Sequence, residues 1–385
     1  VWIPVPGQTY NWTGGGAEGV WTDTSNWDVG GSYPDDANDK AVINTGSESI
    51  STPSGSALTI GELVLGSSYS GTLTLGNNLT LDDSGVWGAD LTISANATLN
   101  LAGKNLTLET GSTFSNSGTL KLQGDETVSN APTNNSGSTV EYTATSGSRA
   151  IKDWTYHHLK INGSGGTFTV GAGETLGGNL TIAAGTFNLN GQIVNVTGNF
   201  SKSGGTLYMH SANDELDIEG NFTVTGGAAD ITASGADIYV KGNINISGDN
   251  SFNPSSGSYY MDGTGNATVS IAGANNDLGY GTSDAYFRVV KTNSTDTVTL
   301  LTDMAGHHFL HEEGIFDVNG HNASFDGVYN GYSGSKLKMS SGTFRCGQNG
   351  YSGDTYSPWW VESGWTEDIS GGTITVYGGK HATYG

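Results

Sequence analysis

The sequence is poor in charged residues, and poorest in basic ones. Charged side chains make up 13% of the 385 residues, about half of the ~25% found in an ordinary globular domain. Lys and Arg number 14 against 37 Asp and Glu, giving a net charge of −23, and the arginines are Arg149, Arg288 and Arg345. Because nucleic acids and anionic lipid surfaces are bound by clustered Lys and Arg, we expect neither as a partner.

Disulfides, proline-rich stretches and long apolar runs are also missing. Cys346 is the single cysteine, so no disulfide can form within the chain. The 7 prolines exclude a collagen-like or proline-rich chain. No apolar run approaches the ~18 residues of a membrane-spanning helix, and we therefore expect no membrane span.

Glycine and alternating apolar residues are abundant. Glycine accounts for 61 residues, and together with the many Ser, Thr and Asn residues, which are poor helix formers, it predicts very little helix. Apolar and polar residues alternate with a period of two, which is typical of half-buried strands. The clearest such segments are residues 73–75, 79–81, 91–93, 99–101, 106–108 and 120–122.

A short phrase, Gly-Asn followed by an apolar residue, recurs at intervals of 20, 22, 22 and 23 residues. Its copies begin at Gly178, Gly198, Gly220, Gly242 and Gly265. A repeat of this length predicts one coil of a β-solenoid, because a single coil cannot bury its inward side chains alone. We therefore predict an all-β fold, an elongated parallel β-solenoid with coils of 20–23 residues. A series of β-sandwiches also has alternating strands, but this repeat is shorter than a sandwich domain.

Tryptophan is concentrated near the two ends of the sequence. We divide the chain into an N-terminal segment (1–56), a solenoid body (57–348) and a C-terminal segment (349–385), and seven of the nine tryptophans lie in the two end segments. These aromatic residues either cap the open coils of the solenoid or contact other subunits or ligands.

The N-terminal peptide, residues 1–6, is apolar and is held extended by its prolines. It either folds back onto its own first coil or adds to a sheet of a neighbouring copy, as in strand donation. The candidate assembly interface comprises Val1, Trp2, Ile3, Val5, Trp359, Trp360 and Trp365.

Several residues of the N-terminal segment form a recognisable string. Asn11-Trp12 is followed by Trp21, Asn26-Trp27 and Pro34, and the body then repeats phrases such as residues 178–191. In these features residues 10–348 resemble bacterial β-strand-repeat surface proteins and autotransporter-passenger-like β-helix proteins. The resemblance implies a secreted, right-handed β-helix that serves as an adhesin, stalk or coat, and it carries over no catalytic residues.

Two groups of acidic residues are candidates for calcium binding, because carboxylate oxygens are the ligands that Ca²⁺ prefers. Glu215, Asp217 and Glu219 alternate with apolar residues and so share one outward face, and the other group lies in the N-terminal segment. A solvated outer face is the competing interpretation. The candidate ligands are Asp35, Asp36, Asp39, Glu215, Asp217 and Glu219.

Catalysis is not expected. Parallel β-helix enzymes that cleave polysaccharides combine acidic residues with a basic residue or a Gly-His-Gly sequence, and neither 305–308 nor 319–322 fits that sequence. The three arginines lie in different coils, and none belongs to a local Asp/Lys constellation of the kind that such enzymes use.

Fourteen Asn-x-Ser/Thr sequons occur, many at Gly-Asn turns. Turn chemistry explains most of them, and N-glycosylation is the alternative. The candidate glycosylation sites are Asn11, Asn78, Asn96, Asn105, Asn179, Asn199 and Asn221.

From these features we expect an extracellular structural protein at the cell surface: a filament, stalk or coat subunit that assembles with copies of itself through its terminal segments. We expect no cofactor other than calcium. The alternatives are an adhesin or glycan-binding β-helix and, from a further class, a polysaccharide lyase or hydrolase.

Overall fold

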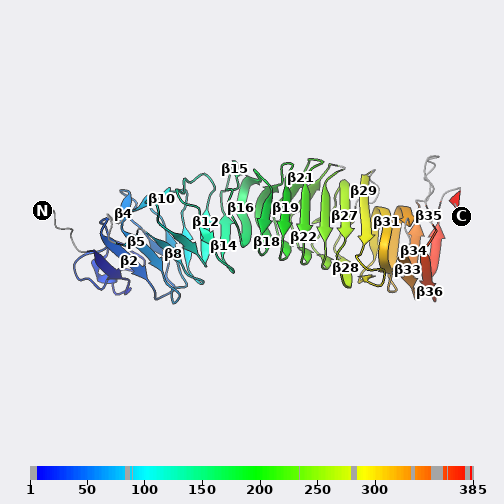
Figure 1. Cartoon of the computed structure of the whole chain (residues 1–385), viewed down its shortest axis with the longest axis horizontal. Coiled ribbons are helices and arrows are strands. Elements are labelled where there is room, and N and C mark those ends of the chain that lie inside the picture. Colours follow the sequence, from blue (N-terminus) through cyan, green and yellow to red (C-terminus); the bar gives the residue numbers. More distant parts are fainter. Residues whose placement is uncertain are drawn as a thin grey trace. The chain divides into compact units, whose positions relative to one another are not determined.

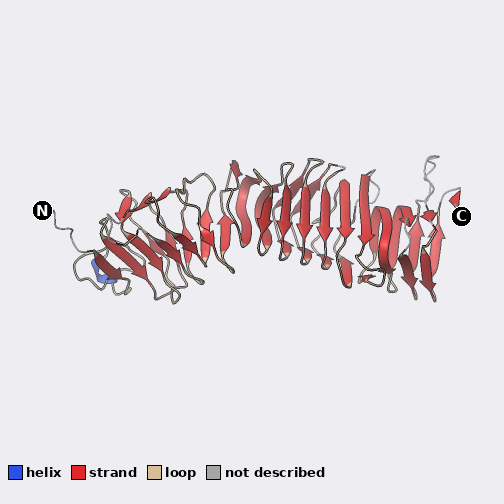
Figure 2. Cartoon of the chain, viewed as in Figure 1, coloured by secondary structure: helices blue, strands red, loops and turns tan. Residues whose placement is uncertain are grey.

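The computed structural model describes residues 7–82, 87–88, 90–233, 235–278, 284–330, 334–347, 359–361, 363–377 and 382–383. Within these ranges the protein consists of strands and turns, apart from one 3-10 turn, η1 (Thr24–Asn26) (Figure 2). The strands pair in parallel and form a β-solenoid of about 13 turns with coils of about 22 residues, which confirms the predicted fold class. The chain divides into two compact units, Val1–Phe168 and Thr169–Gly385. This division coincides with neither of the boundaries proposed from the sequence.

The first unit stacks its strands in three columns (Figure 1). The first column contains β1 (Gln8–Asn11), β2 (Asp39–Ile43), β5 (Glu62–Leu65), β8 (Leu91–Ile93), β11 (Phe114–Asn116) and β13 (Thr133–Asn134). The second contains β3 (Ile50–Ser51), β6 (Thr72–Thr74), β9 (Thr98–Asn100), β12 (Thr119–Leu122), β14 (Thr139–Tyr142) and β16 (His158–Thr169). The third contains β4 (Leu58–Ile60), β7 (Leu79–Leu81) and β10 (Leu106–Leu108), and β15 (Ser148–Ala150) precedes β16. The six strands predicted from alternation are β6 to β10 and β12, each within one residue of its expected bounds.

The second unit has two long columns. One contains β17 (Glu174–Leu176), β19 (Ile193–Val196), β22 (Glu215–Ile218), β25 (Asp237–Val240), β27 (Ser256–Met261), β29 (Asp284–Val290), β31 (Met304–Asp317), β32 (Asn322–Asn330), β34 (Thr343–Cys346) and β37 (Thr373–Val376). The other contains β18 (Leu180–Asn188), β20 (Phe200–Lys202), β23 (Phe222–Val224), β26 (Ile244–Ile246), β28 (Ala267–Ile271), β30 (Thr297–Leu300), the second half of β31, β33 (Ser335–Met339) and β36 (Thr366–Ile369). Two shorter groups of paired strands accompany these columns. One consists of β21 (Thr206–Met209) and β24 (Ala228–Ile231), and the other of β35 (Trp359–Val361) and β38 (Ala382–Thr383).

The core of each unit is built from apolar residues that repeat once per coil. Phe200 pairs in register with Phe222, and Phe222 with Ile244, a step of 22 residues each time. The rings of Phe200 and Phe222 stack with their centroids 4.9 Å apart, and all three side chains are buried. Inward residues therefore form continuous stacks along the coils, while Thr, Ser and Asn occupy the alternate outward positions.

Glycine and asparagine at one corner of the second unit explain the recurring Gly-Asn phrase. Gly220 donates its N–H to the Gly198 carbonyl at 3.0 Å, and the Asn221 N–H reaches Oδ1 of Asn199 at 2.8 Å. The next coil repeats both bonds from Gly242 and Asn243. A Cβ on Gly220 would lie 2.5 Å from the Gly198 oxygen, so only glycine fits this close approach of two backbones. Each coil is thus tied to the previous one by a backbone bond and an asparagine bond.

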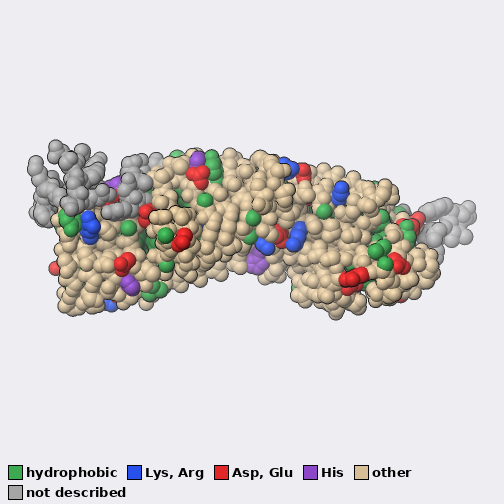
Figure 3. Space-filling model, turned by 180° about the vertical axis from the view of Figure 1, so that it is seen from behind, with side chains coloured by type: hydrophobic (Ala, Val, Ile, Leu, Met, Phe, Trp, Pro, Cys, Tyr) green, Lys and Arg blue, Asp and Glu red, His purple; other side chains and the backbone are tan. Residues whose placement is uncertain are grey.

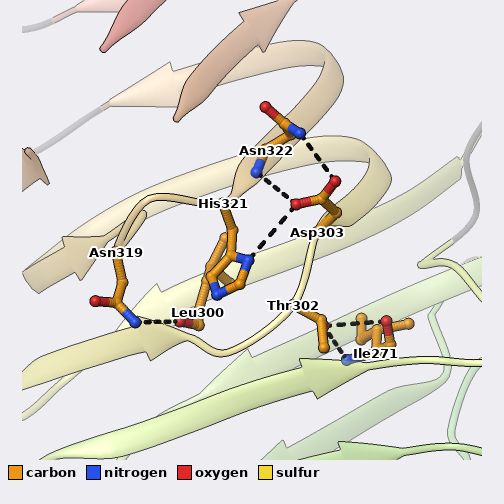
Figure 4. Close-up of polar contacts among 7 residues, drawn as sticks. All are labelled: Ile271, Leu300, Thr302, Asp303, Asn319, His321 and Asn322. Atoms are coloured by element: carbon orange, nitrogen blue, oxygen red, sulfur yellow. Dashed lines mark hydrogen bonds and ion pairs between the residues drawn. The ribbon is translucent and has the colours of Figure 1, made fainter. Parts of the chain in front are cut away.

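Other corners use different side chains for the same purpose (Figure 4). The carboxylate of Asp303 accepts the backbone N–H of Asn322 at 2.9 Å and its Nδ2–H at 2.8 Å, and His321 Nδ1 lies 3.6 Å away. Asn319 donates from Nδ2 to the Leu300 carbonyl at 2.9 Å. The backbone N–H of Asn322 is the largest cause that lowers the pKa of Asp303.

Three tryptophans close the N-terminal end of the first unit. Trp12, Trp21 and Trp27 are almost fully buried, and their rings meet edge to face at 5.1 and 4.9 Å between centroids. Their indole N–H groups are satisfied as well, since Trp21 donates to the Pro34 carbonyl at 3.0 Å and Trp27 to that of Trp21 at 2.8 Å. The capping interpretation of the N-terminal aromatics is therefore supported for these three residues.

Candidate functional site

The last coil of the second unit leaves its inward side chains exposed. Met339 and Phe344, one coil earlier, are completely buried. Their register partners in the last coil, Ile369 and Ile374, are 37% and 36% exposed. We define the open edge as the inward face and unpaired side of β36 and β37, which lie near the C-terminal end in Figure 1.

The backbone of β37 determines which polar groups the open edge offers. Thr373 and Tyr377 donate their N–H groups back to Gly342 and Cys346 of the preceding coil, at 3.0 and 2.8 Å. Successive residues of a strand point their N–H and C=O groups to opposite edges. Ile374 and Val376 therefore direct theirs away from the preceding coil, and no strand in the described part of the chain pairs with that side.

The two strands of the open edge differ in chemistry. In β36 the inward positions are held by Glu367 and Ile369, and Glu367 lies in register with buried Leu337. An inward carboxylate on an edge strand opposes the addition of another strand. In β37 the inward residues are Ile374 and Val376, both apolar. The apolar part of the open edge is therefore β37.

The predicted assembly residues fall partly on this end. Trp359 packs edge to face against Phe344 and Trp365, with centroids 5.6 and 6.1 Å apart, so these two tryptophans border the last coil. Val1, Trp2, Ile3 and Val5 lie outside the described residues, as does the side chain of Trp360.

The aspartates of the N-terminal segment are engaged in a turn. Asp39 is buried and its Oδ2 accepts the backbone N–H groups of Asp35 and Asp36 at 3.0 and 3.1 Å. Asp36 in turn accepts from the backbone and side chain of Asn38. Burial raises the pKa of Asp39 more than these bonds lower it. The described residues contain no group of three or more His, Cys, Asp or Glu side chains that could hold a metal ion, and calcium binding remains a prediction.

The second acidic group lies on the outer face, as predicted. Glu215 and Asp217 alternate with buried Leu216 and Ile218, and Glu219 forms an ion pair with Lys241 of the next coil. Burial, together with the neighbouring carboxylates, raises the pKa of both Glu215 and Asp217. The structure thus gives Glu219 a cationic partner within the protein.

A row of aromatic and charged side chains beside this group was not foreseen. Asp217 is in register with Tyr239, Tyr239 with Tyr260, and Tyr260 with Arg288. The tyrosine rings stack at 4.2 Å, the Arg288 guanidinium lies 5.0 Å from the Tyr260 ring, and Arg288 pairs with Glu312 at 3.2 Å. Arg288 therefore has an acidic partner, Glu312, on the paired strand β31. Each of the two stacked tyrosine rings covers one face of the other.

Several ionisable side chains are buried in the second unit, among them Lys202, His311 and Cys346. Lys202 is completely inaccessible, and burial lowers its pKa to about 8, while its ammonium donates to the Gly226 carbonyl. His311 hydrogen bonds through Nε2 to the Gly314 carbonyl at 2.9 Å, and burial lowers its pKa to about 4. Burial raises the pKa of the Cys346 thiol, so the one cysteine is unreactive at neutral pH.

Many of the sequon asparagines fall into two classes according to their hydrogen bonds. In the first, the asparagine Nδ2, the atom that would carry a glycan, donates a hydrogen bond within the protein, as Asn11 does to Asp28 at 2.7 Å. In the second, Oδ1 accepts a backbone N–H from the next coil, and Nδ2 makes no hydrogen bond among the described residues. Exposed members of this class are Asn78, Asn105, Asn199, Asn221 and Asn266. Asn179 also accepts through Oδ1, and Asn96 is exposed.

Most of the visible surface is neutral. Figure 3 shows acidic and basic side chains in small separate spots over a face made mainly of uncharged polar side chains and backbone. In the described residues no helix is both long and apolar enough to cross a membrane. Comparison with models of protein families, with curated proteins and with solved structures finds no match for this chain.

Proposed function

We propose that this protein is an extracellular structural subunit, which builds a cell-surface filament, stalk or coat from copies of itself joined through their ends. The observation that carries the proposal is the difference between the two ends. Tryptophans cover the core at the N-terminal end of the first unit, whereas the last coil of the second unit exposes Ile369 and Ile374.

The rest of the surface supports a structural role. Unpaired strand edges with exposed apolar residues favour pairing with another chain, and the open edge has both properties. Elsewhere the outward positions carry mostly Thr, Ser and Asn, and opposite charges are paired within the protein, as Glu219 is with Lys241. Contact between copies is therefore favoured at the open edge over the sides of the coils.

Negative-stain electron microscopy of the secreted full chain, with light scattering across a concentration series, tests this function. We expect regular fibres or sheets and a mass that grows with concentration. A monodisperse monomer at every concentration, with no ordered material on the grids, would contradict the proposal.

Glycan binding is the second candidate, and the row of Asp217, Tyr239, Tyr260 and Arg288 favours it. The tyrosine hydroxyls, the Asp217 carboxylate and the Arg288 guanidinium offer hydrogen-bond partners to sugar hydroxyls, although the ring faces that stack on each other are unavailable for sugar stacking. Binding of the monomer on a glycan array, lost in Tyr260→Ala and retained in Ile193→Ala, would support this role. Equal signals from both variants would contradict it.

A further inference from the structure

We propose that residues 1–6 of one copy add to the open edge of the next copy as an antiparallel strand beside β37. This inference rests on the proposed function and specifies the contact through which the copies join. The segment that occupies the edge is the apolar N-terminal peptide of a second copy of this chain.

The acceptor strand offers a defined set of partners. Ile374 and Val376 direct both their side chains inward and their N–H and C=O groups toward the unpaired side of β37. An added antiparallel strand would supply N–H and C=O groups from residues whose side chains also point inward. It must also be apolar there, to cover the exposed side chain of Ile374.

Residues 1–6 meet these requirements by their alternation. Val1, Ile3 and Val5 occupy the odd positions, so their side chains share one face of an extended strand. Pro4 and Pro6 occupy even positions, and their missing N–H groups therefore lie on the opposite edge from those of the odd residues. The peptide can thus pair along one edge, while its prolines block pairing along the other, as prolines do on natural edge strands.

The direction of the added strand follows from the same geometry. In an antiparallel hydrogen-bonded pair, two opposite residues exchange both N–H···O bonds and point their side chains to the same face. In a parallel pair, the inward residues of β37 would bond to the even residues of the peptide, and Pro4 and Pro6 would leave two carbonyls without donors. In the antiparallel register, Ile3 lies opposite Ile374 and Val1 lies opposite Val376. The N–H and C=O groups of Ile374 and Val376 then all have hydrogen-bond partners, because neither proline is needed as a donor.

Such a contact joins different surfaces of successive copies. A head-to-tail interface of this kind leaves a free donor and a free acceptor after each addition, so it produces rings or an open series. Glu367, at the inward position of β36, keeps the neighbouring strand from competing for the peptide. The terminal aromatics then serve separate purposes, since Trp12, Trp21 and Trp27 close the N-terminal end of the first unit and Trp359 and Trp365 border the last coil of the second.

Complementary variants of the full chain test this contact. Ile3→Asp spoils the donor and Ile374→Lys spoils the acceptor, and each is expected to abolish fibres seen by electron microscopy and to leave a monomer. Mixing the two variants should restore a single intact junction and give a dimer that does not extend. Ile193→Lys, at a residue that is 44% exposed in the body of the second unit, is the matched control and should form fibres as the unmodified chain does. Circular dichroism verifies that each variant is folded.

Cysteine pairs test the register. The double variant Ile3→Cys, Ile374→Cys should give a ladder of disulfide-linked oligomers on oxidation, because opposite residues of a hydrogen-bonded pair lie ~5.5 Å apart at Cα. Pro4→Cys with Ile374→Cys, with the side chains on opposite faces, should not. Fibres that persist in Ile3→Asp and Ile374→Lys would overturn the strand contact and leave the proposed function intact. Absence of any assembly by the unmodified chain would overturn the function itself.

Discussion

Replacing Gly220 by alanine tests why glycine recurs at one corner of the coils. The added Cβ would lie 2.5 Å from the Gly198 oxygen and 2.6 Å from Oδ1 of Asn199. Ordinary contact begins near 3.4 Å, so the two coils must separate locally by about 1 Å. That movement weakens the Gly220 bond to Gly198 and the Asn221 bond to Asn199.

The expected cost follows from these contacts. Each hydrogen bond contributes about 1 kcal/mol net, and forcing an extra carbon into a packed site costs about 1–3 kcal/mol. The smaller entropy of an unfolded chain that carries alanine offsets about 0.4–1 kcal/mol. We therefore expect Gly220→Ala to destabilise this corner by about 3 kcal/mol. A free-energy change of that size corresponds to about a hundredfold faster hydrogen exchange at the amides of residue 220 and Asn221.

Gly171→Ala is the matched control, because a Cβ there meets nothing within 4 Å. It should leave exchange at the corner unchanged. Hydrogen exchange measured by NMR or mass spectrometry is the appropriate assay, because coils in contact with neighbours alone can open locally rather than all at once. Equal exchange rates at the corner in the two variants would refute the close-approach explanation of the Gly-Asn repeat.

Buried ionisable groups and the sequons give three further predictions. In the unfolded chain His311 takes up a proton near pH 6.5, whereas in the folded protein it stays neutral down to about pH 4, so the free energy of unfolding should fall by up to about 3 kcal/mol between these pH values. The variant His311→Phe should remove this part of the pH dependence of the unfolding free energy measured in urea titrations. An identical pH dependence in the variant would contradict the burial of His311. The variant Lys202→Met removes a buried charge that has a single carbonyl partner, so at pH 7 its urea unfolding midpoint should equal or exceed that of the unmodified protein. A clearly lower midpoint would show that the bond to Gly226 outweighs the cost of burying the charge. In peptide maps of native material we expect N-linked glycans at Asn221 and none at Asn11, whose Nδ2 is engaged by Asp28; glycosylated Asn11, or an intact mass equal to that of the polypeptide, would remove this expectation.

The fold is predictable from the sequence because its physical causes are local and periodic. Alternation places Leu79 and Leu81 inward, and the 22-residue step from Gly220 to Gly242 reports the length of one coil. Lys202 shows that the type of side chain can mislead. A lysine is expected to point outward because of its charge, yet it follows inward Phe200 by two residues, and the alternation of the strand places it inside.

The outer row of the second unit was missed because coil length varies there. Tyr239 to Tyr260 is a step of 21 residues, but Tyr260 to Arg288 is a step of 28. Insertions of this kind hide the alignment of outward residues, and only the paired strands reveal it. The open edge was hidden for a different reason. Ile369 and Ile374 have the same pattern as buried residues, and their exposure depends on the absence of a further paired strand in the described residues.

High-resolution electron microscopy of the assembled native material would resolve the junction between successive copies. We expect each junction to contain an extra strand beside β37, formed by residues 1–6 of the next copy, with Ile3 opposite Ile374. Copies joined through the sides of their coils, with β37 unpaired at every junction, would contradict this expectation.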